Sequence, residues 1–210
     1  WWLKIISKII LSTLPISYSF WQFVGLFRHG RMDRSEYSLG IFKSHLVKSG
    51  ITNLEKKVVL EIGPGDSIST DIIAYAYGAS SILVDTGKFA NFSIKTYLIL
   101  RNKLYELGLP VPDLDSSDTL ESILKKTNSL YLTEGLNSMK LIANESVDMI
   151  FSQAVLEHIR LYEFDEIIKE LSRVQKSDGV SSHQIDLRDH LSESLNNLRF
   201  SEKLWESNFF

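Results

Sequence analysis

Two apolar runs, each with an acidic residue at or near its end, constrain the fold of this chain more than any other feature. The first run, residues 58–62, reads Val-Val-Leu-Glu-Ile and leads into a turn made of Gly63, Pro64, Gly65 and Asp66. The second run, residues 81–85, ends in Asp85, 22 positions after Gly63. Short apolar runs bounded by glycine are typical of buried parallel strands. With a helix predicted from Ser67 to about Tyr77, the unit is strand, glycine turn, helix and strand.

A unit of this kind is how α/β proteins hold a nucleoside, because the glycines admit the ligand to the backbone and the acid binds the ribose hydroxyls. A dinucleotide fingerprint needs a third glycine, but Ile68 stands in its place. No Gly-Lys-Ser/Thr follows the turn, so a P-loop is excluded. The alternative at this point is an ordinary strand–turn–helix unit in which the glycines only make the turn.

The pattern Glu61-x-Gly63-x-Gly65 followed by Asp66 resembles motif I of the class I S-adenosylmethionine-dependent methyltransferases. Acidic residues suit this ligand, which carries a sulfonium and an ammonium instead of phosphates. The resemblance implies that S-adenosylmethionine is the cofactor and that its binding residues are Glu61, Gly63, Pro64, Gly65, Asp66 and Asp85.

Strands and helices are predicted to alternate along the rest of the chain. We expect strands at residues 58–62, 81–85, 129–133, 147–152 and 180–186, and helices at 37–47, 67–77, 91–107, 118–126 and 164–174. Asp118 and Glu121 are predicted to form a capping box, and residues 177–179 a turn. This order predicts an α/β fold with a Rossmann-like, doubly wound, mostly parallel sheet.

Two parts are expected, an N-terminal helical extension at residues 1–50 and a cofactor-binding domain at residues 51–210. A complete methyltransferase sheet would extend beyond Phe210, so we expect its C-terminal part to be missing from this chain.

Residues 145–159 resemble the fourth motif of small-molecule class I methyltransferases, which implies that Ser152 and Gln153 line the cleft between cofactor and acceptor. The Asp/Asn-Pro-Pro-Tyr sequence of enzymes that methylate nucleic-acid amino groups is missing. A net charge of −3 without any run of Lys or Arg also argues against a nucleic-acid partner. In the third motif Glu134-Gly135-Leu136 lacks the usual aspartate, so Glu134 or a backbone group would hold the adenine.

Polar residues gather after the fifth predicted strand, where we expect the base that deprotonates the acceptor. Asp186 lies at the strand's carboxyl tip, and His190 titrates near neutral pH. His183 lies earlier and would support them, and the alternative is a solvated loop. His29 and His158 are the next candidates. A metal site at His183, Asp186, Asp189 and His190 matches no standard ligand spacing and the chain has no cysteine, so we predict no metal.

The first 27 residues carry the least regular pattern in the chain. No charged residue occurs from Ile9 to Phe27, a run of 19, but the run contains polar residues and Pro15. Lys4 and Lys8 share one face of a predicted helix. Three alternatives stay open: packing on the domain or on a partner subunit, lying on a membrane surface, and spanning the bilayer. We predict two short helices that do not span, in a cytoplasmic protein with peripheral membrane contact.

The predicted function is S-adenosylmethionine-dependent methyl transfer to a hydroxyl of a small molecule or glycan. Residues 26–30, 182–190 and 195–201 resemble a bacterial branch associated with cell-surface polysaccharide synthesis. Two alternatives remain, a non-catalytic cofactor-binding protein in a membrane-associated assembly, and a nucleotide-dependent oxidoreductase, which Ile68 disfavours.

Overall fold

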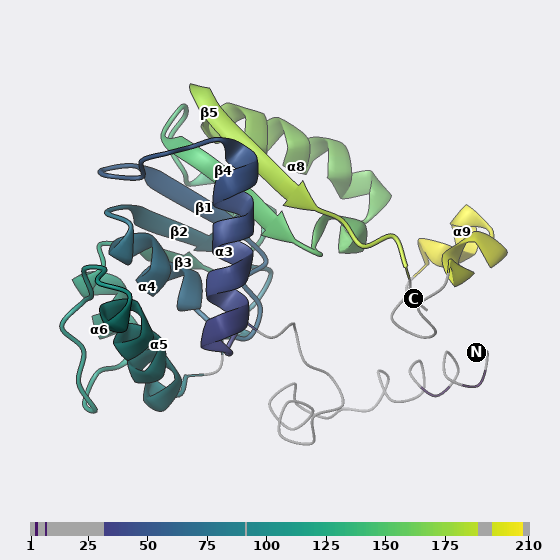
Figure 1. Cartoon of the computed structure of the whole chain (residues 1–210). Helices are drawn as coiled ribbons and strands as arrows, with labels where there is room; N and C mark the ends of the chain where they lie inside the picture. The colour runs from purple at the N-terminus through teal and green to yellow at the C-terminus, as the bar shows by residue number, and fades with distance from the viewer. Residues whose placement is uncertain (1–2, 4–6, 8–31, 91, 189–194, 208–210) are drawn as a thin grey trace.

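The computed structural model describes residues 3, 7, 32–90, 92–188 and 195–207. Five strands form one sheet in the order β3-β2-β1-β4-β5, and every neighbouring pair is parallel (Figure 1). The chain therefore starts in the middle of the sheet at β1, winds outward to β3, and then returns to the centre at β4. This topology confirms the predicted Rossmann-like, doubly wound α/β fold.

The strands are β1 (Val58–Ile62), β2 (Ser80–Val84), β3 (Leu130–Leu132), β4 (Val147–Gln153) and β5 (Gln175–Gln184). The longer helices are α3 (Ser35–Ser49), α4 (Ser69–Ala76), α5 (Ile94–Glu106), α6 (Leu120–Lys126) and α8 (Leu161–Val174). Shorter helical turns are α7 (Leu136–Lys140), η1 (Leu156–His158), η2 (Asn196–Arg199) and α9 (Glu202–Trp205).

The sheet is covered on both faces, as parallel sheets require. On one face, Val59, Leu83 and Phe151 pack against α3, α4 and α5. On the other face, Leu60 and Ile150 pack against Leu171 and Val174 of α8. Figure 1 shows α3 in front of the sheet and α8 behind it. Neighbouring residues of β1 thus face opposite cores, which explains why every residue of the strand except Glu61 is apolar.

The helix α3 belongs to this core, although residues 1–50 were predicted to be an extension. Leu39 and Phe42 of α3 are buried in the same cluster as Val59 of β1. Gly50 ends the helix in the left-handed conformation, with φ of 71°. The boundary at residue 50 stays a prediction, but the helix just before it is part of the layer that covers the sheet.

The capping box of α6 lies one residue further along the chain than predicted. Thr119, not Asp118, is the N-cap, and its hydroxyl accepts from the backbone N–H of Ser122 at 3.2 Å. The Ser122 hydroxyl accepts from the Thr119 N–H at 2.9 Å in return. The carboxylate of Asp118 accepts instead from Lys126 at 2.8 Å. The predicted box of Asp118 and Glu121 was therefore wrong, because serine performs the role expected of the glutamate.

The predicted turn at residues 177–179 was also wrong, because β5 runs through it. Val147 pairs with Gln175 but Met149 pairs with Val180, so β5 carries extra residues in a bulge. A Cβ on Gly179 would lie 3.0 Å from the Val147 carbonyl oxygen. Glycine therefore permits a close backbone approach inside a strand rather than a turn between elements.

Most of the prediction for residues 1–27 lies outside the described residues. Within 32–90, 92–188 and 195–207, no helix combines the length and the apolar character that a bilayer span requires.

Candidate active site

The carboxyl ends of β1 and β4 mark the point where the winding of the sheet reverses. From β1 the chain moves toward β2 and β3, whereas from β4 it moves toward β5 (Figure 1). Open α/β sheets bind ligands in the crevice at such a switch point. The predicted site residues at positions 63–66, 85, 134 and 152–153 all lie at or just beyond carboxyl ends of strands. The fold therefore brings these segments together at the carboxyl end of the sheet.

The turn after β1 needs glycine for two separate reasons. Gly63 and Gly65 have φ of 69° and 66°, in the left-handed region. A Cβ on Gly63 would lie only 2.5 Å from Cγ2 of Val155, which follows β4. Ala154, just before it, also has a positive φ, 54°. The segment after β4 is thus bent so that Val155 packs directly onto the glycine turn.

Asp85 ties the glycine turn to the segment after β3. One carboxylate oxygen accepts the Gly65 N–H at 3.0 Å, and the other accepts the Thr86 N–H at 2.7 Å. The Asp85 backbone donates to Leu132 O at 2.9 Å and accepts from Gly135 N at 2.8 Å. These contacts fix the Asp85 carboxylate between the glycine turn and the segment after β3.

Glu61 lies beneath this edge as a buried acid. Its side chain is 1% exposed, and its Oε2 has no hydrogen-bond partner among the described residues. Burial raises the pKa of Glu61 to about 8, and the charge of Asp85 acts in the same direction. Pro64 and Asp66 are buried beside it. A cationic ligand would favour the charged form of Glu61. These acidic side chains therefore fit a sulfonium or an ammonium group.

The start of α4 is closed to a pyrophosphate group. The Ile68 N–H donates to the Tyr97 hydroxyl at 3.3 Å, and the Ser69 N–H donates to the Ser67 hydroxyl at 3.1 Å. Ile68 and Tyr97 are both completely buried. Phosphate binding at a helix start depends on N–H groups that have no other partner. Here these two N–H groups already donate to side-chain hydroxyls.

Polar contacts join the ends of β4 and β5, and they involve one residue that was not predicted to belong to the site. The Ser152 hydroxyl lies 2.8 Å from Nδ1 of His183. Gln153 Oε1 lies 3.2 Å from Nε2 of His45, and the Ser182 hydroxyl lies 2.8 Å from its Nδ1. Burial lowers the pKa of both histidines. Sequence reasoning missed His45 because its partners are more than 100 positions away; its place one turn after buried Phe42 was the available signal.

The predicted base cluster is only partly brought together. Asp186 lies just beyond β5, where its carboxylate pairs with Arg188 at 3.1 Å and its N–H donates to Glu157 at 3.1 Å. His183 is engaged with Ser152, and His190 lies outside the described residues. His158 is exposed in η1. The assignment of the base therefore stays a prediction.

Glu134 and the expected lack of a metal also stay predictions. The Glu134 side chain is exposed, and its backbone N–H donates to the Ser138 hydroxyl at 2.8 Å, in the turn next to Asp85. In the part of the chain that the structure describes, no three His, Asp or Glu side chains gather as metal ligands would.

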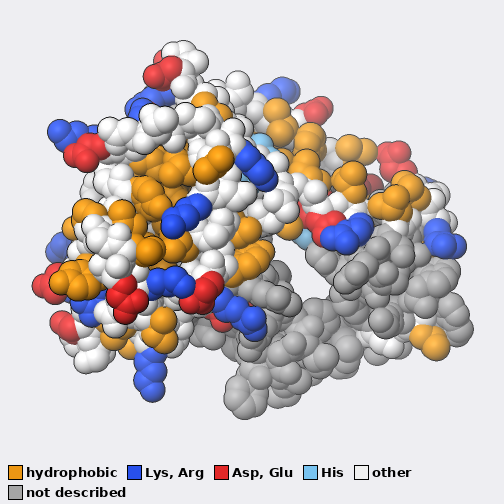
Figure 2. Space-filling model, in the orientation of Figure 1, with side chains coloured by type: hydrophobic (Ala, Val, Ile, Leu, Met, Phe, Trp, Pro, Cys, Tyr) orange, Lys and Arg blue, Asp and Glu red, His pale blue; other side chains and the backbone are white. Residues whose placement is uncertain are grey.

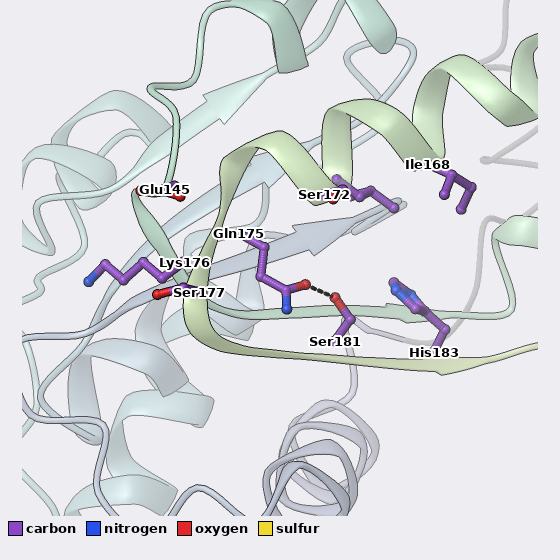
Figure 3. Close-up of a pocket in the computed structure, with 9 residues that line it drawn as sticks. Glu145, Ile168, Ser172, Gln175, Lys176, Ser177, Ser181 and His183 are labelled. Carbon is purple, nitrogen blue, oxygen red and sulfur yellow. Dashed lines mark hydrogen bonds between the residues drawn. The ribbon is translucent and has the colours of Figure 1, made fainter.

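A pocket of about 420 Å³ lies elsewhere, between α8 and β5 (Figure 3). Ile168 and Ser172 of α8 face Gln175, Ser181 and His183 of β5 across it. Of the predicted site residues, only His183 lines this pocket. We place the candidate site at the switch point instead, because the acids and the glycine turn gather there.

Comparison with known proteins gives one family match. Residues 101–182 match the model of a family described as a methyltransferase domain. The match covers less than half of the chain. It begins in α5 and includes β3 and β4, but it does not include the glycine turn. It supports the resemblance to methyltransferases, which rested mainly on motif I. No curated protein sequence matches the chain significantly.

Several solved structures are similar to this chain at low sequence identity. Phosphoethanolamine N-methyltransferase 2 from Haemonchus contortus, crystallised with S-adenosylmethionine, is 17% identical over 78% of this chain and 32% of that one, with a TM-score of 0.47. A putative S-adenosylmethionine-dependent methyltransferase from Methanococcus maripaludis is 14% identical over 80% and 64%, with a TM-score of 0.47. An S-adenosylmethionine-dependent methyltransferase from Thiobacillus denitrificans, crystallised with S-adenosylhomocysteine, is 12% identical over 81% and 56%, with a TM-score of 0.43.

This chain spans less than two thirds of the length of each of these proteins.

Proposed function

We propose that this protein is an S-adenosylmethionine-dependent methyltransferase whose acceptor is a hydroxyl of a small molecule or glycan. The observation that carries the proposal is the contact between Asp85 and the Gly65 N–H, next to the buried Glu61. It assembles a glycine turn and two acids at the switch point of the sheet. The ribose hydroxyls would bind Asp85, and the methionine part would lie over residues 63–65.

The blocked start of α4 favours this cofactor over a dinucleotide. Tyr97 and Ser67 occupy N–H groups that a pyrophosphate would need. The two positive groups of S-adenosylmethionine would be attracted to Asp85 and would favour the charged form of Glu61, which a phosphate would not do. The match of residues 101–182 to a methyltransferase domain supports the same choice.

The chain's contribution to the reaction is mainly orientation. When bound, S-adenosylmethionine supplies a methyl group on an electrophilic sulfonium. The residues at the carboxyl edge would hold the acceptor oxygen in line with that methyl carbon. Ser152 and Gln153 at the end of β4 would line the cleft between the cofactor and the acceptor. A base from the segment at the end of β5 would remove the hydroxyl proton, with Asp186, His190 and His183 as candidates.

The glycan acceptor, the cytoplasmic location and peripheral membrane contact through residues 1–27 belong to the same proposal. They are supported by the sequence pattern shared with the polysaccharide-associated branch, and by the lack of a basic run that would suit nucleic acid.

Binding and transfer experiments test the proposal in two steps. Calorimetry with S-adenosylmethionine, S-adenosylhomocysteine and NAD should give binding of the first two only, and preferential binding of NAD would favour an oxidoreductase. Incubation with methyl-labelled S-adenosylmethionine and a pool of sugars should then move label into the pool. Binding without transfer to any acceptor would favour the non-catalytic alternative.

A further inference from the structure

One buried histidine connects the helical layer to the ends of β4 and β5. His45 of α3 is 1% exposed, and its ring lies 4.9 Å from the ring of Phe151. Its Nδ1 lies 2.8 Å from the Ser182 hydroxyl, and its Nε2 lies 3.2 Å from Gln153 Oε1. Both ring nitrogens are therefore engaged, each by a different strand of the active-site edge.

These contacts determine the tautomer of the ring. The carbonyl oxygen of Gln153 can only accept a hydrogen bond, so Nε2 of His45 must carry the proton. Burial lowers the pKa of His45, with Lys48 of the same helix acting in the same direction, and the ring is neutral near pH 7. Nδ1 then has a free lone pair, and the Ser182 hydroxyl donates to it.

The orientation of Gln153 follows from this arrangement. With Oε1 held by His45, the amide nitrogen of Gln153 must point away from the histidine. Ile62 pairs with Ser152, so Gly63 and Gln153 each follow directly after a paired residue at the carboxyl end of the sheet. Two N–H donors are thus presented next to the turn over which the methionine part of the cofactor is proposed to lie.

We propose that His45 is a positioning residue that holds the Gln153 carboxamide with its N–H groups toward the carboxylate of the bound cofactor. The inference rests on the proposed function, because Gln153 is otherwise only a predicted site residue. A carboxylate is the group on this ligand that an amide N–H donor would favour, because hydrogen bonds to charged acceptors are the stronger ones. His45 itself does not touch the ligand.

A pair of substitutions separates the two contacts of the ring. His45→Gln extends an amide to the place of Nε2 and can still donate to Gln153. His45→Asn reaches only the place of Nδ1 and can still accept from Ser182. Two probes are used in calorimetry: S-adenosylhomocysteine, which has the carboxylate, and 5′-methylthioadenosine, which lacks the whole amino-acid part.

We expect His45→Asn to weaken S-adenosylhomocysteine binding by roughly three- to tenfold, the worth of one hydrogen bond, and to leave 5′-methylthioadenosine binding unchanged. His45→Gln should restore the parent's ratio of the two affinities. Gln153→Leu, which removes the carboxamide and retains the histidine, should give the same selective loss even if the His45 variants fold poorly. Nitrogen NMR of labelled histidine should show a neutral ring protonated at Nε2.

Three results would overturn the inference: equal weakening of both probes in His45→Asn, which indicates a structural role; unchanged S-adenosylhomocysteine binding in Gln153→Leu; or a ring protonated at Nδ1. If the parent binds both probes and only the ratio fails to change, the role of His45 is wrong and the proposed function stands. A parent that binds neither probe contradicts both.

Discussion

The contact between Gly63 and Val155 predicts a large and specific cost for adding one methyl group to the glycine turn. In Gly63→Ala, the new Cβ would lie 2.5 Å from Cγ2 and 2.9 Å from Cγ1 of Val155, and the backbone would keep a φ of 69°. The left-handed conformation costs about 1–2 kcal/mol for a residue with a Cβ. Overpacking adds about 1–3 kcal/mol. The free energy of unfolding should therefore fall by about 2–5 kcal/mol.

Gly50→Ala is the matched control for this substitution. Gly50 has nearly the same φ, 71°, but nothing lies within 4 Å of the Cβ it would gain. It should therefore show only the backbone cost of about 1–2 kcal/mol. Adding Val155→Ala to Gly63→Ala removes both Cγ atoms and leaves Val155 Cβ as the nearest atom, at 3.3 Å. The double variant should thus recover most of the packing cost.

Urea unfolding of the parent, the three single variants and the double variant measures these differences as a double-mutant cycle. The reasoning is refuted if Gly63→Ala is no less stable than Gly50→Ala, or if Val155→Ala gives no rescue. Either result would mean that the segment after β4 does not rest on the glycine turn.

Three further predictions concern titration, the base and metal ions. Burial raises the pKa of Asp71 from 3.8 to about 7. The unfolded chain therefore loses this proton at a lower pH than the folded chain. The free energy of unfolding should fall as the pH rises from about 4 through 7. Asp71→Asn should therefore gain stability relative to the parent across that window, by at most about 4 kcal/mol, and urea unfolding at several pH values that shows a constant difference would contradict the shift. Replacing the true base, by Asp186→Asn or His190→Ala, should lower turnover ~100- to 10,000-fold with cofactor affinity nearly intact; if both variants stay within a few-fold of the parent, the base lies elsewhere, with His29 or His158 as the next candidates. Methyl transfer should continue in the presence of a chelator, and loss of activity that magnesium or zinc restores would favour a metal site.

Local patterns in the sequence predicted the frame of the molecule well. The strand β1, the glycine turn and the acid after β2 follow from short-range rules, because periodicity, backbone freedom and strand ends are properties of a few adjacent residues. The confirmed parallel sheet follows from their alternation with helices. The same rules failed at Gly179, where a glycine that reads as a turn instead permits a bulge against Val147.

The parts that depend on distant contacts were not predictable in the same way. His45 meets Gln153 only after the sheet has formed, and Val155 meets Gly63 across two strands. The composition of the surface does not indicate the site either, because charged and apolar side chains are mixed over the face shown in Figure 2. Sequence patterns therefore indicated which segments form the edge of the sheet but not which side chains hold one another there.

The affinity of Asp85→Ala for S-adenosylmethionine, measured by calorimetry, tests the central claim most directly. Hydrogen bonds to a charged acceptor contribute about 1.5–3 kcal/mol, so binding should weaken roughly tenfold or more. Asp178→Ala, which removes an exposed acid in the bulge of β5, is the control and should bind as the parent does. An Asp85→Ala variant that binds S-adenosylmethionine as tightly as the parent, or a parent that does not bind it, would contradict the account.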